Sequence, residues 1–243
     1  MKIIASDYDG TVNYNGISED DRDAIAKFRK AGNKFGIVTG RDLELALWVL
    51  YDLKKCKIEV DFVICCTGAI ILTGEGKIAR IKAGKVTEKF HEVIKLASEC
   101  GVGTFNMNYK LKKVFVDPQG RIPYSLDDLP EFTQMNLWFE NSDDAIKFNE
   151  IVQNYKDIIS SYQNGKSVDM PPPSTSKVTG IYDYAEQFDS PEIYVVGDNL
   201  NDIPMIKEFC SFAVSNAHPR VKELANYQCD RIADMIDFIM EEK

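Results

Sequence analysis

Three short apolar runs in the first 70 residues each end in a small polar motif. Residues 2–6, 35–38 and 61–66 have the length of buried strands, and the segments between them carry apolar residues at helical spacing. Buried strands that alternate with helices are typical of a parallel sheet. The sequence therefore predicts an α/β fold with a Rossmann-like parallel sheet, and its polar motifs should meet at the carboxyl edge of that sheet.

The alternation stops near residue 81 and returns after three consecutive prolines. The intervening segment predicts strands such as 135–139, a helix capped by Ser142 and an extended stretch at 158–162, without strict strand–helix–strand order. Elements grouped in this way indicate an α+β unit. The predicted organisation is a first part of the core at 1–81, an α+β insert at 82–173 and a second part of the core at 174–243.

Composition excludes several classes of function. The formal net charge of −9 argues against a nucleic acid or an anionic membrane as partner, because both select basic surfaces. No apolar run approaches the roughly 20 residues that span a bilayer, and the first residues turn acidic too early for a signal peptide. We therefore expect a cytoplasmic protein. Two histidines, and six cysteines without C-x-x-C spacing, leave carboxylates, Lys, Ser, Thr and a hard metal ion for catalysis.

Acidic residues follow two of the predicted strands. Asp7 and Asp9 come directly after the first strand, and Asp198, Asn201 and Asp202 follow a later one. Carboxylates crowded at one sheet edge repel one another unless a cation lies between them. Oxygen ligands without His or Cys favour Mg²⁺, although Mn²⁺ accepts the same ligands. A magnesium ion held in this way usually also binds a phosphate, so we expect phosphoryl chemistry with water or a carboxylate as the attacking group.

Four short motifs resemble, in order, those of the haloacid dehalogenase (HAD) superfamily. They are DYDGT at 7–11, VTGR at 38–41, SK at 176–177 and GDNLND at 197–202. The segment AVSNAHP at 213–219 is similar to one in the Cof-type subfamily, subclass IIB, whose α+β cap has the position and class of the predicted insert. Four motifs in the right order are far more specific than any one of them. The resemblance implies a HAD core with an inserted α+β cap.

The same resemblance implies a Mg²⁺-dependent phosphatase that works through an aspartyl-phosphate. Asp7 would attack the phosphorus, while Asp9 would protonate the leaving oxygen and then activate water. An acid at the position of Asp9 favours phosphate esters, because a halide leaves without a proton. The residues implied for the phosphoryl oxygens are Thr39, Gly40, Lys177 and Asn201. Those implied for the metal are the carboxylates of Asp7 and Asp198, the backbone carbonyl of Asp9 and, as a ligand or close neighbour, Asp202.

Other positions carry open alternatives. Arg41 either contacts the substrate or pairs with an acidic neighbour. Thr67 stands where Cof-type proteins often have Asn, and its hydroxyl could donate one hydrogen bond to the substrate. Asn216 either lies near the phosphate or forms a turn. Lys166 is the alternative to Lys177, which is followed by Val in place of the usual Gly.

The leading function is hydrolysis of a small phosphorylated metabolite, such as a sugar phosphate, beneath a cap that closes as a lid. A phosphomutase would use the same aspartyl-phosphate, but mutases with similar caps tend to have a Gly/Ser second motif and a strongly basic cap. A non-catalytic binding or regulatory protein on the same scaffold is the third alternative, because fold alone does not prove function. The intact set of acidic residues and Lys177 argues against it.

Overall fold

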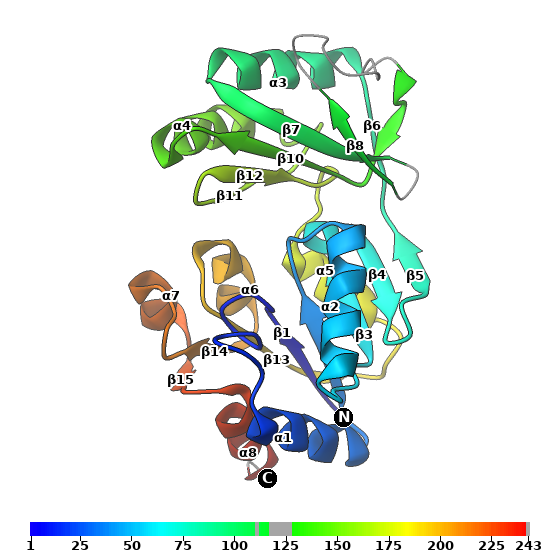
Figure 1. Cartoon of the computed structure of the whole chain (residues 1–243), viewed down its shortest axis with the longest axis vertical. Helices are drawn as coiled ribbons and strands as arrows, with labels where there is room; N and C mark the ends of the chain where they lie inside the picture. Colours follow the sequence, from blue (N-terminus) through cyan, green and yellow to red (C-terminus); the bar gives the residue numbers. More distant parts are fainter. Residues whose placement is uncertain (110–111, 117–127, 242–243) are drawn as a thin grey trace.

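The computed structural model describes residues 1–109, 112–116 and 128–241. Figure 1 shows two layers of structure, with a core built from both ends of the chain and a smaller α+β cap above it. Two chain segments join them, one leading from β5 into the cap and one leading from β12 to α5. The predicted α/β fold with an inserted α+β cap is therefore confirmed.

The described core contains one sheet of eight strands in the order β15-β14-β13-β1-β2-β3-β4-β5. The strands from β15 to β3 pair in parallel, and β4 and β5 extend the sheet as an antiparallel hairpin. The bounds of these strands are β1 Lys2–Ser6, β2 Lys34–Val38, β3 Phe62–Cys65, β4 Ile70–Thr73, β5 Ile78–Ile81, β13 Glu192–Gly197, β14 Cys210–Val214 and β15 Tyr227–Cys229.

Parallel register brings the ends of the central strands to one edge. Ser6 of β1 pairs with Ile37 of β2 on one side and with Val196 of β13 on the other. The residues that follow these strands therefore meet above β1, as expected for the carboxyl edge of a parallel sheet. This register explains why motifs separated by almost 200 positions in the sequence share one site.

Helices connect the core strands and cover the cap sheet. Those of the core are α1 Glu19–Lys30, α2 Leu43–Lys55, α5 Lys177–Ala185, α6 Ile203–Glu208, α7 Pro219–Leu224 and α8 Ile232–Glu241, with the single turns η1 Cys66–Gly68 and η4 Leu200–Asp202. Those of the cap are α3 Glu88–Glu99, α4 Ser142–Val152 and the turn η3 Gln153–Tyr155. Side chains cap most of these helices; Ser18, for example, accepts a hydrogen bond from the amide of Asp21 at the start of α1.

The cap sheet is antiparallel and has two unlike faces. Its strands are ordered β11-β12-β10-β7-β8, and a short pair formed by β6 and β9 lies beside it. The bounds are β6 Gly84–Lys85, β7 Val102–Tyr109, β8 Lys112–Val116, β9 Glu131–Phe132, β10 Gln134–Phe139, β11 Tyr162–Asn164 and β12 Ser167–Met170. Apolar residues on one face pack with α3 and α4, whereas polar residues occupy the alternate positions.

Two separate apolar clusters hold the structure together. The core cluster draws its buried residues from Ile3 to Leu72 and from Ile181 to Ile239, while the cap cluster draws its own from Phe90 to Met170. The change from one cluster to the other falls between Leu72 and Phe90 and again between Met170 and Ile181. The boundaries at 81/82 and 173/174 stay predictions.

Several local predictions were wrong. Asn141, not Ser142, caps α4 by accepting a hydrogen bond from the amide of Asp144. The stretch at 158–162 does not form one extended segment, because the hairpin β11–β12 begins only at Tyr162. The long strand β7 was not predicted at all, nor was the short strand β6 at the start of the insert.

No helix in the described part of the chain is long and apolar enough to cross a membrane. The cytoplasmic location stays a prediction.

The position of the start of α5 depends on a close approach between its backbone and that of η1. Gly68 of η1 has a φ of +103°, and a Cβ built there would lie 2.0 Å from the carbonyl oxygen of Ser176, the N-cap of α5. A Cβ at Gly180 would likewise lie 2.9 Å from the Cα of Gly68. Glycine at both positions lets α5 lie against η1, which sets the position of Lys177 in the first turn.

Replacing Gly68 by Ala should therefore lower the free energy of unfolding by about 3 kcal/mol, the sum of left-handed strain and overpacking. Gly32 is the matched control, because it has a φ of +86° with nothing within 4 Å of its Cβ position. Gly32→Ala should cost only about 1 kcal/mol in urea unfolding. Equal losses in the two variants would show that the approach of α5 to η1 is not tight.

Candidate active site

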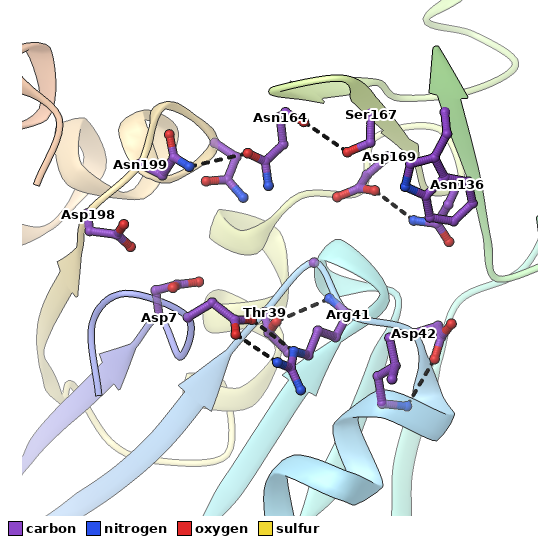
Figure 2. Close-up of a pocket in the computed structure, with 15 residues that line it drawn as sticks. Asp7, Thr39, Arg41, Asp42, Asn136, Asn164, Ser167, Asp169, Asp198 and Asn199 are labelled. Atoms are coloured by element: carbon purple, nitrogen blue, oxygen red, sulfur yellow. Dashed lines mark hydrogen bonds and ion pairs between the residues drawn. The ribbon is translucent and has the colours of Figure 1, made fainter. Parts of the chain in front are cut away.

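A cavity of about 220 Å³ lies between the carboxyl edge of the core sheet and the polar face of the cap sheet. Figure 2 shows Asp7 and Asp198 on the core side and Asn136 and Asp169 on the cap side. The core residues that line it are Asp7, Asp9, Thr39, Gly40, Arg41, Asp42, Leu45, Asp198, Asn199 and Asn201. The cap residues that line it are Asn136, Trp138, Asn164, Ser167 and Asp169.

Lys177 lies buried beneath this cavity between two carboxylates. Its Nζ is 2.6 Å from Asp7 Oδ1 and 2.6 Å from Asp202 Oδ1. Burial by itself lowers the pKa of the Lys177 ammonium, but Asp202 and Asp7 outweigh burial and raise it. Lys177 is therefore a fixed positive charge that joins α5 to the ends of β1 and η4. By contrast, Lys166, the alternative from the sequence, is exposed.

Asp202 is fully buried, and both of its carboxylate oxygens accept hydrogen bonds. Oδ1 accepts from Lys177, and Oδ2 accepts from the backbone amides of Asp198 and Asn199 at 3.1 Å each. A Cβ at Gly197 would lie 2.6 Å from Asp202 Oδ2, so this carboxylate fits closely under the end of β13. Asp202 thereby fixes the loop that presents Asp198.

Three carboxylates gather around one point. Asp7, Asp198 and Asp202 each offer an oxygen, and these oxygens lie within 4.8 Å of one another. Burial raises the pKa of Asp7 well above its ordinary value against the opposing effect of Lys177, and the other two carboxylates add to the rise. Burial and Asp202 likewise raise the pKa of Asp198 to about 6. One lysine leaves two of the three negative charges unpaired, so the cluster suits a divalent cation bound through oxygen.

The loop after β1 leaves space for such an ion. Thr11 Oγ1 donates to Asp198 Oδ1 at 3.0 Å, which turns Asp198 toward Asp7. Gly10 has a φ of +81°, and a Cβ there would lie 2.5 Å from Asp198 Oδ2. Glycine thus keeps open the space beside this carboxylate. An all-oxygen donor set, an excess of negative charge and an open approach together fit Mg²⁺.

Asp9 is exposed and forms a bidentate ion pair with Arg41. Its oxygens lie 2.8 Å from Nε and 2.7 Å from Nη2 of the guanidinium. The guanidinium also lies over the ring of Tyr8, with its centre 5.2 Å from the ring centroid. Arg41 therefore pairs with an acidic neighbour and also lines the cavity, so the structure accommodates both alternatives drawn from the sequence.

Thr39 and Gly40 form the wall of the cavity under the cap. Thr39 Oγ1 accepts a hydrogen bond from the backbone amide of Arg41 at 3.1 Å. The carbonyl of Gly40 accepts from Nε2 of Gln134 in the cap at 2.8 Å. Gln134 Oε1 in turn accepts from the hydroxyl of Thr67 at 3.1 Å. One cap side chain therefore joins the loops after β2 and β3.

Two of the candidate substrate contacts lie away from the cavity. Neither Thr67 nor Asn216 is among the described residues that line the cavity. Thr67 has a φ of +51°, a conformation that Asn adopts more readily than a β-branched residue, and its hydroxyl bonds the cap. Asn216 donates to the carbonyl of Gly10 at 2.7 Å. This geometry favours positioning roles for both, Thr67 toward the cap and Asn216 toward the loop after β1. Asn201 does line the cavity.

The cap residues of the cavity were not found from the sequence. They lie on β10, β11 and β12, where polar and apolar residues alternate, as in QMNLW at 134–138 and SVDM at 167–170. This alternation predicts a half-buried strand with one polar face. It does not show that the polar face is turned toward the core.

Comparison with known proteins assigns the family. The model for haloacid dehalogenase-like hydrolases matches residues 4–235, so the chain belongs to this family. The chain is 26% identical over 238 residues, covering 95% of its length and 90% of the relative, to 5-amino-6-(5-phospho-D-ribitylamino)uracil phosphatase YcsE of Bacillus subtilis (strain 168). Together, the family and this relative support a phosphatase activity.

Solved structures agree on the fold. A haloacid dehalogenase-like hydrolase from B. subtilis matches with a TM-score of 0.79 at 17% identity, covering 98% of this chain and 99% of that one. The HAD subclass IIB sugar phosphatase BT4131 matches with a TM-score of 0.78 at 18% identity, covering 99% of each chain. The predicted resemblance to Cof-type HAD hydrolases of subclass IIB is confirmed.

Removing the buried lysine tests the charge balance of the site. Lys177→Met should lower the free energy of unfolding of the metal-free protein by about 3–5 kcal/mol, because two buried carboxylates lose their counter-charge. Lys166→Met makes the same change at an exposed position and should stay within about 0.5 kcal/mol of the wild type. Urea unfolding in the presence of a chelator measures both. Similar stabilities for the two variants would contradict the charge balance described above.

Proposed function

We propose that this protein is a Mg²⁺-dependent phosphatase that hydrolyses a small phosphate monoester through an aspartyl-phosphate on Asp7. The observation that carries the proposal is the buried Asp7 carboxylate, which faces the cavity and is held by Lys177 beside Asp198. A carboxylate fixed on one oxygen by an ammonium has its other oxygen available for attack on phosphorus. The relative from B. subtilis, which is named for a phosphorylated ribityl compound, supports a phosphate ester as substrate.

The metal would be held by the carboxylates of Asp7 and Asp198 and by the backbone carbonyl of Asp9. Asp202 would lie beside it, because both of its oxygens already accept hydrogen bonds inside the protein. When bound, Mg²⁺ offsets the charge of the carboxylates and of the phosphoryl oxygens. The protein supplies the remaining positioning by fixing Asp7 and Asp198 at the ends of two adjacent strands.

Phosphoryl transfer depends mainly on positioning and on charge stabilisation. We assign the phosphoryl oxygens to the hydroxyl of Thr39, the loop at Gly40, the ammonium of Lys177 and the side chain of Asn201. Thr39 accepts from the amide of Arg41, so its own hydroxyl hydrogen is available to a ligand. Lys177 keeps its proton because its two carboxylate partners raise its pKa.

Asp9 is the proposed acid and base. It would give a proton to the leaving oxygen and then take one from the attacking water. Its ion pair with Arg41 holds it at the rim of the cavity, on the loop that also carries Asp7. A substrate that draws Arg41 toward itself would release Asp9 for this role.

The size of the cavity and the cap contacts beside it support a small metabolite as substrate. The cavity holds about 220 Å³, and the cap meets the core through Gln134 at Gly40 and through Asn164, which accepts from Asn199 at 3.2 Å. A phosphorylated side chain of a folded protein would have to displace these contacts. Further closure of the cap over a bound substrate would exclude bulk water from the reacting centre.

The central test is phosphate release from a panel of sugar phosphates, nucleotides and an aryl phosphate. We expect release with Mg²⁺, loss of release with a chelator and recovery when Mg²⁺ is restored. Asp7→Asn should lower kcat by at least about 10³-fold, because the nucleophile is lost. Asp143→Asn makes the same chemical change on the exposed first turn of α4 and should retain the wild-type rate.

Two outcomes would contradict the proposal. Full activity of Asp7→Asn would rule out an aspartyl-phosphate on Asp7. Absence of phosphate release from every ester, in a protein that still binds Mg²⁺, would favour a phosphomutase that needs a bisphosphate activator, or a binding protein.

A further inference from the structure

The outer side of α2 carries four large apolar side chains that stay exposed. They are Leu45, Leu47, Trp48 and Tyr51, which are 41%, 43%, 59% and 61% exposed. The opposite side of the helix packs into the core cluster, and Figure 1 shows α2 lying over the core sheet with its outer side uncovered by the described elements. The four side chains together expose roughly 400 Å². Apolar patches of this size on a soluble protein mark interaction sites.

The most exposed line of α2 combines aromatic rings with a charge at each end. Glu44, Trp48, Tyr51 and Lys55 follow the spacing i, i+4, i+7 and i+11, which places them in one stripe along the helix. All four are exposed. The rings of Trp48 and Tyr51 meet edge to face, with their centroids 5.6 Å apart. The stripe therefore has a negative end, an aromatic centre and a positive end.

This stripe is complementary to itself when a second copy is turned end to end. A two-fold axis midway between Trp48 and Tyr51 would pair the two α2 helices antiparallel. Trp48 would then lie opposite Tyr51 of the partner subunit, and Glu44 opposite Lys55 of the partner subunit. Glu44 and Lys55 lie about 16 Å apart along the helix axis, so an opposite-charge pair would flank the aromatic centre on each side. The charge order thus fits a second copy of this chain.

The size of the patch indicates a dimer that exchanges with the monomer. A standard interface buries about 800 Å² on each partner, and the apolar side chains of α2 supply roughly half of that area. We therefore expect a Kd on the order of 10 µM. The net charge of −9 on each chain opposes unspecific association, so that copies should pair only where a local surface is complementary.

We propose that α2 is the interface of a two-fold symmetric homodimer in which the α2 helices of two copies pack antiparallel, with Trp48 against Tyr51 of the partner subunit and Glu44 beside Lys55 of the partner subunit. The proposal does not depend on the phosphatase activity. It has a consequence for the cavity nonetheless, because Leu45 belongs both to the patch and to the cavity wall. Each copy would therefore lie beside the mouth of the other copy's cavity.

Sedimentation velocity of the full chain between about 1 and about 200 µM tests the dimer. The average mass should rise with concentration from that of one chain toward that of two. Leu47→Asp should raise the Kd at least tenfold, because the symmetric contact would bury the new charge twice. Ile146→Asp on α4 is the matched control, since Ile146 is also 43% exposed, and it should keep the wild-type Kd.

Charge reversal tests the antiparallel pairing without removing any apolar surface. Glu44→Lys and Lys55→Glu should each raise the Kd at least tenfold, because each change turns two attractive pairs into repulsive ones. The double variant Glu44→Lys/Lys55→Glu restores opposite charges across the two-fold axis and should return within threefold of the wild-type Kd. Both positions are exposed, so urea unfolding should show that all three variants stay folded.

Tryptophan fluorescence locates the contact on α2. The chain has two tryptophans, so Trp138→Phe leaves Trp48 as the reporter. Its emission should shift to shorter wavelength as concentration rises through the Kd, because the indole leaves water. The shift should disappear when Glu44→Lys is added to this background.

Three results would overturn the proposal. The first is a single-chain mass at every concentration. The second is a dimer whose Kd is unchanged in Leu47→Asp and in both single charge variants, or one that forms without a shift of the Trp48 emission, because such a dimer would use another face. The third is a double charge variant that stays as weak as the single variants, which would contradict the antiparallel pairing.

Discussion

The buried ammonium of Lys177 is the interaction on which the rest of the site depends. It joins Asp7 at the end of β1 to Asp202 after β13, and it is carried by the first turn of α5. Three segments that are far apart in the sequence are thereby fixed at one point of the sheet edge. Two buried carboxylates would strongly destabilise this edge without a counter-charge. The approach of α5 to Gly68 is the steric condition that lets the lysine reach both of them.

The charged groups of the site are distributed unevenly between the core side and the cap side of the cavity. Lys177 compensates one carboxylate of the cluster and leaves a net charge that suits a divalent cation, while Arg41 neutralises Asp9 at the rim. In the proposed mechanism, the core side of the cavity therefore offers positive groups and a metal position to a phosphoryl group. The cap side offers acceptors from Asn136 and Asp169.

The sequence was sufficient for the centre of the core because β1, β2 and β3 are buried and read as continuous apolar runs. β1 has the predicted bounds, and the parallel order of the strands brings Asp7, Thr39 and Asp198 to one edge as expected. The cap was harder to predict because β7 carries Gly103, Thr104 and two buried asparagines, a composition that conceals a central strand. The partners of Thr67 and Asn216 depend on how distant loops meet, which no local pattern contains. For the same reason, the sequence showed polar positions in the insert without showing that they face the site.

The measurement that tests the central claim most directly is a crystal structure with Mg²⁺ and beryllium fluoride, which mimics a phosphorylated aspartate. The account predicts a beryllium–oxygen bond to Asp7, a metal ion held by Asp7, Asp198 and the carbonyl of Asp9, and Lys177 in contact with both Asp7 and the fluoride group. A fluoride adduct on another carboxylate, or a metal ion that does not contact Asp7, would contradict it.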